Sequence, residues 1–222
     1  MFSLHIGNKN YSSWSLRPWI LLKELNIPFE EILHPFGHES FSDFSPTAKV
    51  PCLVEGKIVV WDSLAITEYI AETHHYVWPS NKVARAWARS AVAEMHSGFF
   101  ALRNYCGMNV GLRLKLHEWP TQLLADIERL QTLWSEGLEK FGGPFLAGSE
   151  FTAVDAFFAP VVFRVQTYGI KLGELEKRYC AQMLGLDSMK LWEQAALKEV
   201  WRDESHEQEV LSFASIVDDL RC

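Results

Sequence analysis

Residues 49–66 read KVPCLVEGKIVVWDSLAI, and this stretch decides the fold. Two short apolar runs stand on either side of Glu55-Gly56, a pattern typical of a β-hairpin. From Ser63 to Ala71 apolar side chains recur at spacings of three or four, which predicts a helix. The stretch therefore predicts two antiparallel strands followed directly by a helix.

Upstream, the sequence predicts a strand, a loop, a helix and a second strand. Residues 2–6 alternate apolar and polar side chains, as in a strand with one buried face, and residues 29–33 indicate another strand. Between them, residues 15–25 have helical spacing, with Pro18 in the expected first turn, where its missing N–H costs least. Residues 34–48 indicate a loop with at most a short helix. The order is βαβ, loop, ββα.

The second part of the chain has long helical periodicity and little strand signal. One apolar stripe runs from Val83 to Leu102 and another from Leu123 to Phe141, with further stripes downstream. The sequence predicts an α/β domain over residues 1–77, a linker over 78–82, and an all-helical bundle of four to six helices over 83–222.

Bulk composition excludes several function classes. A net charge of -7 and an isoelectric point of about 5.6 provide no basic field to attract nucleic acid or anionic membranes. The four cysteines form no C-x-x-C pair, no secretory leader is evident, and no apolar run approaches the roughly 18 residues of a membrane span. A soluble protein of the reducing cytoplasm is expected.

Two helix starts carry groups suited to chemistry. Asp62-Ser63 precedes the helix after the hairpin, where free N–H groups attract a carboxylate and an aspartate attracts an ammonium. Ser12 and Ser13 precede the first helix, where a hydroxyl could donate to a thiolate. For isolated residues, simple helix caps remain the commoner explanation. The same holds for Val50-Pro51, since only about 5–6% of X-Pro bonds are cis.

Taken together and in order, three motifs resemble the soluble glutathione transferases. They are the loop SSWSLR at 12–17, KVP at 49–51 and DSLAI-x-x-Y at 62–69. The resemblance covers nearly the whole chain and implies a thioredoxin-like N-terminal domain followed by an all-helical domain. The loop is most similar to serine-type members, especially the zeta class, although Trp14 stands where that class has cysteine.

The resemblance also implies roles for individual residues. Ser12, or else its neighbour Ser13, would stabilise the thiolate of glutathione. The peptide would be held by the residues that match the family's binding motifs, with His38 placed only by a gapped alignment: His38, Lys49, Val50, Pro51, Asp62 and Ser63. Glutathione is then a co-substrate, no other cofactor or metal is implied, and a homodimer is expected.

The electrophile would bind between the first loop and the helical domain. The residues expected there are Trp14, Met95, Phe99, Arg103 and Met108. Core packing explains Met95 and Phe99 equally well. Arg103 and Arg164 are candidates to hold a substrate carboxylate, with surface ion pairs as the alternative.

A transferase that directs the glutathione thiolate at a small electrophile is the function expected from these features. One alternative is a glutathione-dependent cis–trans isomerase of the maleylacetoacetate type, which predicts basic residues over the thiolate. Another is a module that binds glutathione or a partner without catalysis. A separate motif, Thr152-x-x-Asp155, predicts a capping box, a structural feature worth about 1 kcal/mol at Thr152.

Overall fold

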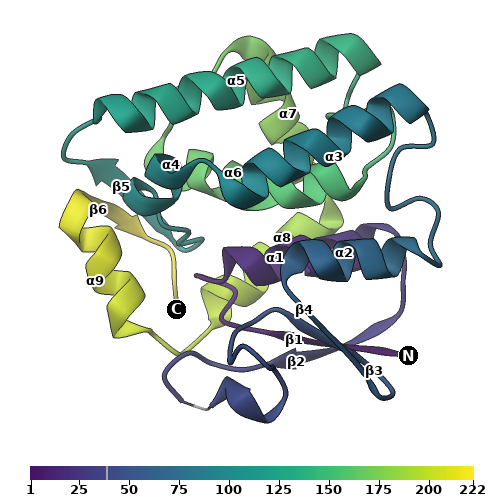
Figure 1. The fold of residues 1–222 in the computed structure, drawn as a ribbon. Coiled ribbons are helices and arrows are strands. Elements are labelled where there is room, and N and C mark those ends of the chain that lie inside the picture. The colour runs from purple at the N-terminus through teal and green to yellow at the C-terminus, as the bar shows by residue number, and fades with distance from the viewer. Residues whose placement is uncertain (39) are drawn as a thin grey trace.

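The computed structural model describes residues 1–38 and 40–222, and its first part has the predicted βαβ and ββα order (Figure 1). The sheet order is β2-β1-β3-β4, with β1 parallel to β2 and antiparallel to β3. The elements are β1 (Phe2–Ile6), α1 (Ser13–Glu24), β2 (Phe29–Leu33), the short 3-10 helix η1 (Phe41–Asp43), β3 (Cys52–Glu55), β4 (Ile58–Trp61) and α2 (Ser63–Ala71).

Helix α1 begins two residues earlier than the apolar spacing predicts. The N-terminal residue of α1 is Ser13, so Pro18 lies inside the helix rather than in its first turn. Its missing N–H therefore leaves the Trp14 carbonyl without its usual helical donor. The helix still buries Leu16, Trp19 and the residues around them between the sheet and the second half of the chain.

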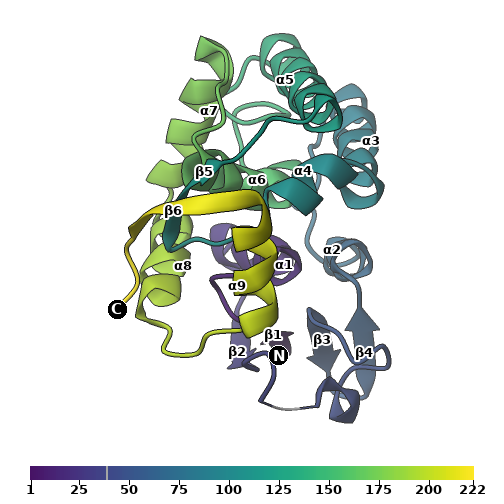
Figure 2. The same ribbon diagram turned by 90° about the vertical axis from the view of Figure 1, so that its left-hand side faces the viewer.

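Helices α3 to α9 make up most of the second half, which is more helices than the four to six expected (Figures 1 and 2). They are α3 (Lys82–Ser97), α4 (Phe100–Tyr105), α5 (Thr121–Phe141), α6 (Ala153–Tyr168), α7 (Glu174–Gly185), α8 (Asp187–Lys198) and α9 (Glu204–Phe213). Helix α6 is almost wholly buried and packs against α1, which joins the two halves. No helix in the described ranges is both long and apolar enough to cross a bilayer.

The stripe from Val83 to Leu102 is interrupted rather than continuous. Helix α3 ends at Ser97, and Phe99 has a left-handed backbone with φ of 53°. A Cβ at Gly98 would lie 2.8 Å from the Glu94 carbonyl oxygen, so only glycine fits this close turn. The prediction that one helix carries Met95, Phe99 and Leu102 was therefore wrong.

A two-stranded sheet also lies in the second half, which the sequence interpretation missed. Strands β5 (Leu112–Leu116) and β6 (Ala214–Asp219) pair antiparallel, from Leu116 opposite Ala214 to Leu112 opposite Asp219. The alternation Leu112, Leu114, Leu116 was the available signal, since these side chains are buried. The chain end is thereby tied to the middle of the second half.

The capping box at Thr152 is confirmed and is larger than predicted. The fully buried Asp155 carboxylate accepts a bond from the Thr152 N–H at 3.0 Å, and also from the Leu146 N–H at 2.9 Å and the Tyr179 hydroxyl at 3.3 Å. Asp155 thus connects α6, α7 and the preceding loop.

Candidate functional site

Ser12 stands immediately before α1 but does not cap it. Its side chain makes no capping bond, and its hydroxyl donates instead to the Ser15 Oγ at 2.7 Å. The Ser15 Oγ also accepts from the Gly7 N–H at 3.2 Å. Within the described part of the chain, the Ser13 hydroxyl has no hydrogen bond. Helix capping therefore does not account for either serine.

Both serines line a hollow at the N-terminal end of α1, which we call the α1 hollow. It has a volume of about 470 Å³, a size suited to a small ligand. The charged side chains on its wall are Lys49, Arg103, Arg164 and Glu209, with His206 beside them. The remaining wall is formed by Tyr11, Ser12, Ser13, Trp14, Phe36, Phe41, Ala48, Val50, Gly107 and Met108.

Asp62 and Ser63 form the start of α2, as predicted. Asp62 has a left-handed backbone, with φ of 73°, and its Oδ1 accepts from the N–H groups of Leu64 and Ala65 at 2.8 and 3.4 Å. Its Oδ2 lies 3.4 Å from His96 Nε2. Asp62 is therefore an N-cap, and one carboxylate oxygen still faces away from its own helix.

Ser63 is fully buried and touches the first helix. Its Oγ accepts from Arg17 Nη1 at 3.4 Å. The Arg17 guanidinium lies over the Trp14 ring at 4.1 Å and over the Phe157 ring at 4.7 Å. Burial, followed by repulsion from Arg164 and Arg103, lowers the pKa of Arg17. Arg17 thus connects Ser63 to Trp14.

A second hollow, the α2 hollow, adjoins the first and also has a volume of about 470 Å³. Its residues are Trp14, Thr47, Lys49, Val50, Pro51, Trp61, Asp62 and Ser63. Trp14, Lys49 and Val50 line both hollows, so the two form one continuous surface. The Val50–Pro51 peptide bond at their junction is cis.

Some expected residues lie elsewhere. His38 is exposed and is not among the residues around either hollow. Met95 is fully buried in the core, and Phe99 borders a different surface depression beside α4 and α5. The break between α3 and α4 turns Phe99 away. Arg103 and Met108 do line the α1 hollow.

The two arginines of the α1 hollow are set in different surroundings. Arg164 is buried, and its Nε donates to the Cys106 carbonyl at 2.7 Å. Burial lowers the pKa of Arg164 to about 10. Arg103 is half-buried, with its guanidinium 5.4 Å from the centre of the Trp14 ring. Among residues 1–38 and 40–222, no carboxylate forms an ion pair with either arginine.

Several residues of the site were not among the candidates named from the sequence. Tyr11, His206 and Glu209 line the α1 hollow, and His96 contacts Asp62 from α3. Tyr11 directly precedes the serines, which was a usable signal. His206 and Glu209 follow Ser12 by almost 200 residues, and no local pattern connects them to it.

The described residues contain no cluster of three or more His, Cys, Asp or Glu side chains placed to hold a metal ion. All four cysteines are free thiols, and Cys52, Cys106 and Cys180 are buried. The polar groups of the site are hydroxyls, guanidiniums, one lysine, carboxylates and the imidazoles of His96 and His206, together with the N-terminal ends of α1 and α2.

Two family models match the chain: the glutathione S-transferase N-terminal domain over residues 11–73 and the glutathione S-transferase C-terminal domain over residues 110–195. A probable maleylacetoacetate isomerase from Caenorhabditis elegans is 27% identical over 166 residues, which cover 72% of this chain and 77% of that protein. A stringent starvation protein A homolog from Haemophilus ducreyi is 24% identical over 177 residues, covering 76% and 79%.

Among solved structures, a glutathione transferase homolog from Burkholderia with bound glutathione has the same fold, with a TM-score of 0.67 and 22% identity. The match covers 88% of this chain and 97% of that one. The first model matches most of the sheet domain, and the second matches a large part of the helical half. The chain belongs to the glutathione S-transferase family.

Proposed function

We propose that the protein is a glutathione transferase that binds glutathione across the α2 hollow and directs its thiolate into the α1 hollow. The observation that carries this proposal is the continuity of the two hollows through Trp14, Lys49 and Val50. Each hollow begins at a helix N-terminus, which favours negative charge. An extended peptide with a carboxylate at its head and a thiol in its middle matches this arrangement.

The head of the peptide is assigned to α2. The Ser63 hydroxyl and the α2 N-terminus suit the γ-glutamyl carboxylate, and the outward oxygen of Asp62 suits its ammonium. The Val50 main chain would pair with the cysteinyl unit beside Pro51. Lys49 is exposed and lines both hollows, so it suits the glycine carboxylate better than His38 does.

The thiol is assigned to Ser12. Its proton now points to Ser15, but rotation of the two hydroxyls makes Ser15 the donor to Ser12 and turns the Ser12 proton toward a sulfur in the α1 hollow. Lowering a thiol pKa from about 8.5 by ~2 units takes ~2.7 kcal/mol. One hydrogen bond to a charged acceptor supplies roughly 1.5–3 kcal/mol, which is sufficient. Ser13 is the second candidate for the same role.

Replacing Ser63 by alanine tests the head-group assignment. Loss of its hydroxyl is expected to weaken glutathione binding roughly tenfold, the effect of one hydrogen bond to a charged group, and to change kcat at saturating glutathione by less than about twofold. Calorimetric titration gives the affinity, and steady-state kinetics give kcat. Ser90→Ala, at an exposed serine of α3, is the matched control. Equal affinity in Ser63→Ala and the parent would remove Ser63 from the site.

A second candidate function is the glutathione-dependent isomerisation of a dicarboxylic enone. The observation that favours it is the pair Arg103 and Arg164, which line the α1 hollow without a carboxylate partner among the described residues. Arginine binds carboxylates through two parallel hydrogen bonds. The relative from Caenorhabditis elegans, whose name includes maleylacetoacetate isomerase, agrees with this candidate.

Comparing an electrophile that carries a carboxylate with its neutral methyl ester separates the two candidates. If Arg103 holds the carboxylate, Arg103→Gln lowers kcat/KM for the acid roughly tenfold and leaves the ester almost unchanged. The ratio of the two substrates cancels any effect on folding or on thiol ionisation. A direct assay with maleylacetone reports isomerisation itself. If acid and ester lose activity equally, Arg103 is not a carboxylate ligand.

We further infer a homodimer in the cytoplasm. Strand β4 is at the edge of the sheet and exposes Ile58 and Trp61, at 49% and 43% of their surface, which suits a contact between two copies. Light scattering gives the mass in solution.

A module that binds glutathione without ionising its thiol is the remaining alternative, and the absence of thiolate absorbance in the complex would favour it.

A further inference from the structure

The last part of the chain, residues 199–222, lies beyond the matched C-terminal domain and returns to the loop that carries Ser12. Figure 2 shows this segment, in yellow, crossing in front of α1. At its start, the buried Glu199 carboxylate accepts from the Lys9 N–H at 2.6 Å and the Asn10 N–H at 3.2 Å. Two main-chain donors of the Ser12 loop are therefore satisfied by this segment.

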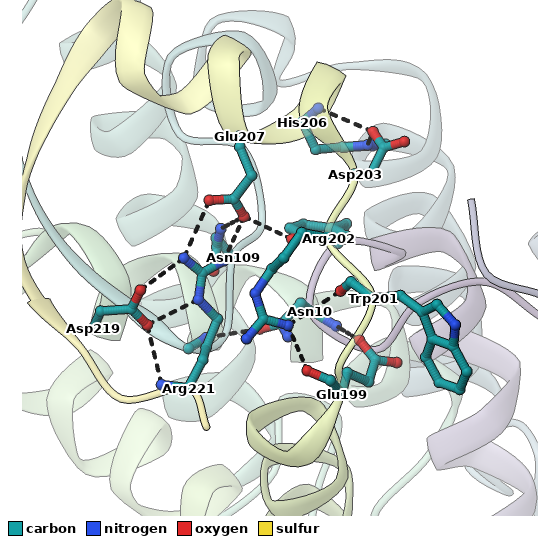
Figure 3. A network of polar contacts seen from close by, with 12 residues as sticks. Asn10, Asn109, Glu199, Trp201, Arg202, Asp203, His206, Glu207, Asp219 and Arg221 are labelled. Carbon is teal, nitrogen blue, oxygen red and sulfur yellow. Dashed lines mark hydrogen bonds and ion pairs between the residues drawn. The ribbon is translucent and has the colours of Figure 1, made fainter. Parts of the chain in front are cut away.

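Glu207 on α9 contacts the residue next to Ser12. Its Oε1 accepts from the Tyr11 hydroxyl at 2.6 Å and from Asn109 Nδ2 at 3.2 Å, and both of its oxygens bind the Arg221 guanidinium. Arg221 is held in turn by Asp219 at 2.8 Å (Figure 3). Burial alone would raise the pKa of Glu207, but the bonds from Arg221, Tyr11 and Asn109 lower it, so it remains an anion.

The ring of Tyr11 also contacts the last segment of the chain. His206 stacks on Tyr11 with ring centres 5.2 Å apart, and on Phe36 at 5.1 Å. Asp203 fixes His206 through a contact of 2.6 Å to Nδ1. His206 and Glu209 also line the α1 hollow. The segment thus both orders the loop and forms part of the hollow's wall.

The placement of the Ser12 hydroxyl depends on this loop. A hydrogen bond to a thiolate requires the donor within a few tenths of an ångström, and displacements of ~1 Å in active sites cost on the order of a hundredfold in rate. Lys9, Asn10 and Tyr11 are the three residues directly before Ser12, and all three are fixed by residues 199–207.

We propose that residues 199–222 act as a clamp on the Ser12 loop, with Glu207 as a positioning residue that acts through Tyr11 on the Ser12 hydroxyl. The clamp rests on the proposed function, since its effect is on the ionisation of bound glutathione. Neither Glu207 nor Tyr11 needs to touch the sulfur.

Two single variants remove the same contact from opposite sides. Tyr11→Phe deletes the hydroxyl and keeps the ring on His206, whereas Glu207→Ala deletes the acceptor. Each is expected to lower kcat roughly tenfold, to leave KM for glutathione within about twofold, and to move the pH midpoint of kcat upward. In the double variant the loss is no larger than in the single ones, because one path is interrupted twice. Glu204→Gln, exposed on the same helix, is the control and retains parental kinetics.

The pH midpoint separates positioning from stability. A loss of folded protein lowers the rate at every pH and leaves the midpoint in place, and thermal melting of each variant reports that loss directly. Glu207→Gln keeps the side-chain volume and an acceptor for Tyr11, so it should restore much of the rate if Glu207→Ala disturbs folding.

The outcomes also distinguish the clamp from the proposed function. If the parent protein does not ionise bound glutathione, the proposed function and the clamp are both overturned. If the parent ionises it and the two variants keep the parental midpoint, the clamp alone is overturned. The clamp is also overturned if Tyr11→Phe lowers kcat and raises its pH midpoint while Glu207→Ala keeps the parental kcat and midpoint. Tyr11 would then act on the thiol directly.

Discussion

Replacing Ser12 by alanine is expected to raise the pKa of the bound glutathione thiol by about one to two units and to slow conjugation at neutral pH roughly ten- to a hundredfold. The reason is the loss of the one hydroxyl assigned to the thiolate. Affinity for glutathione should stay within about threefold, because Asp62, Ser63, Lys49 and Val50 still hold the peptide. Thiolate absorbance of the complex across a pH series gives the pKa, and turnover gives the rate.

Ser13→Ala is the matched control for this prediction. Its hydroxyl lines the same hollow one residue further along, at the first position of α1. We expect it to change the thiol pKa by much less than Ser12→Ala does. Parental turnover in Ser12→Ala together with a large loss in Ser13→Ala would transfer the role to Ser13.

The largest effect on stability is expected at Asp155. Replacing it by alanine leaves the N–H groups of Leu146 and Thr152 and the Tyr179 hydroxyl unpaired in a buried region. Each unpaired buried donor costs about 1–3 kcal/mol, so the free energy of unfolding should fall by about 3–5 kcal/mol in denaturant titration. Asp187→Ala, at an exposed aspartate in the first turn of α8, should cost less than about 1 kcal/mol. A similar small loss at Asp155 would contradict the assigned network.

Asp155 also makes the folding stability depend on pH, and the direction of that dependence follows from its pKa. Burial raises the pKa of its carboxyl to about 6, above the roughly 3.9 of an unfolded aspartate. The folded state therefore binds this proton more tightly, and the stability it contributes is complete below pH ~4 and is lost as the pH rises through about 6. Between pH ~4 and pH ~6, the free energy of unfolding of the parent should fall by about 2–3 kcal/mol relative to that of Asp155→Asn, as measured by denaturant titration at each pH. If the difference in unfolding free energy between the two proteins stays constant with pH, the predicted pKa shift is contradicted.

The N-terminal half could be predicted from sequence because local signals decided it. Each strand was marked by alternation or by an apolar run, and the start of α2 was marked by Asp62-Ser63. The start of α1 was misplaced because the prediction began the helix next to its first regularly spaced apolar residue. In the structure Ser13 and Ser15 are buried as well, which helix propensity does not report.

The second half was predicted less well where a single residue or a distant partner decides the structure. Gly98 ends α3 through one close contact with Glu94, although the apolar stripe continues past it. Strand β6 exists because it pairs with β5 about a hundred residues away. Neither feature has a strong local signal.

The candidate site likewise combines residues with a local sequence signal and residues that are brought in by tertiary packing. Residues in the short motifs, Ser12, Lys49, Val50, Pro51, Asp62 and Ser63, do line the two hollows. Residues contributed by α4, α6 and α9 reach the α1 hollow only through tertiary packing. Of these, Arg103 and Arg164 were among the candidates, as was Met108 just after α4, whereas His206 and Glu209 were not.

The central claim is that this surface ionises the thiol of glutathione, and a pH titration of thiolate absorbance with saturating glutathione tests it most directly. The bound thiol is predicted to titrate about two units below the ordinary value of roughly 8.5, and this shift should shrink in Ser12→Ala. A bound thiol that titrates near its ordinary value in the parent protein would contradict the account.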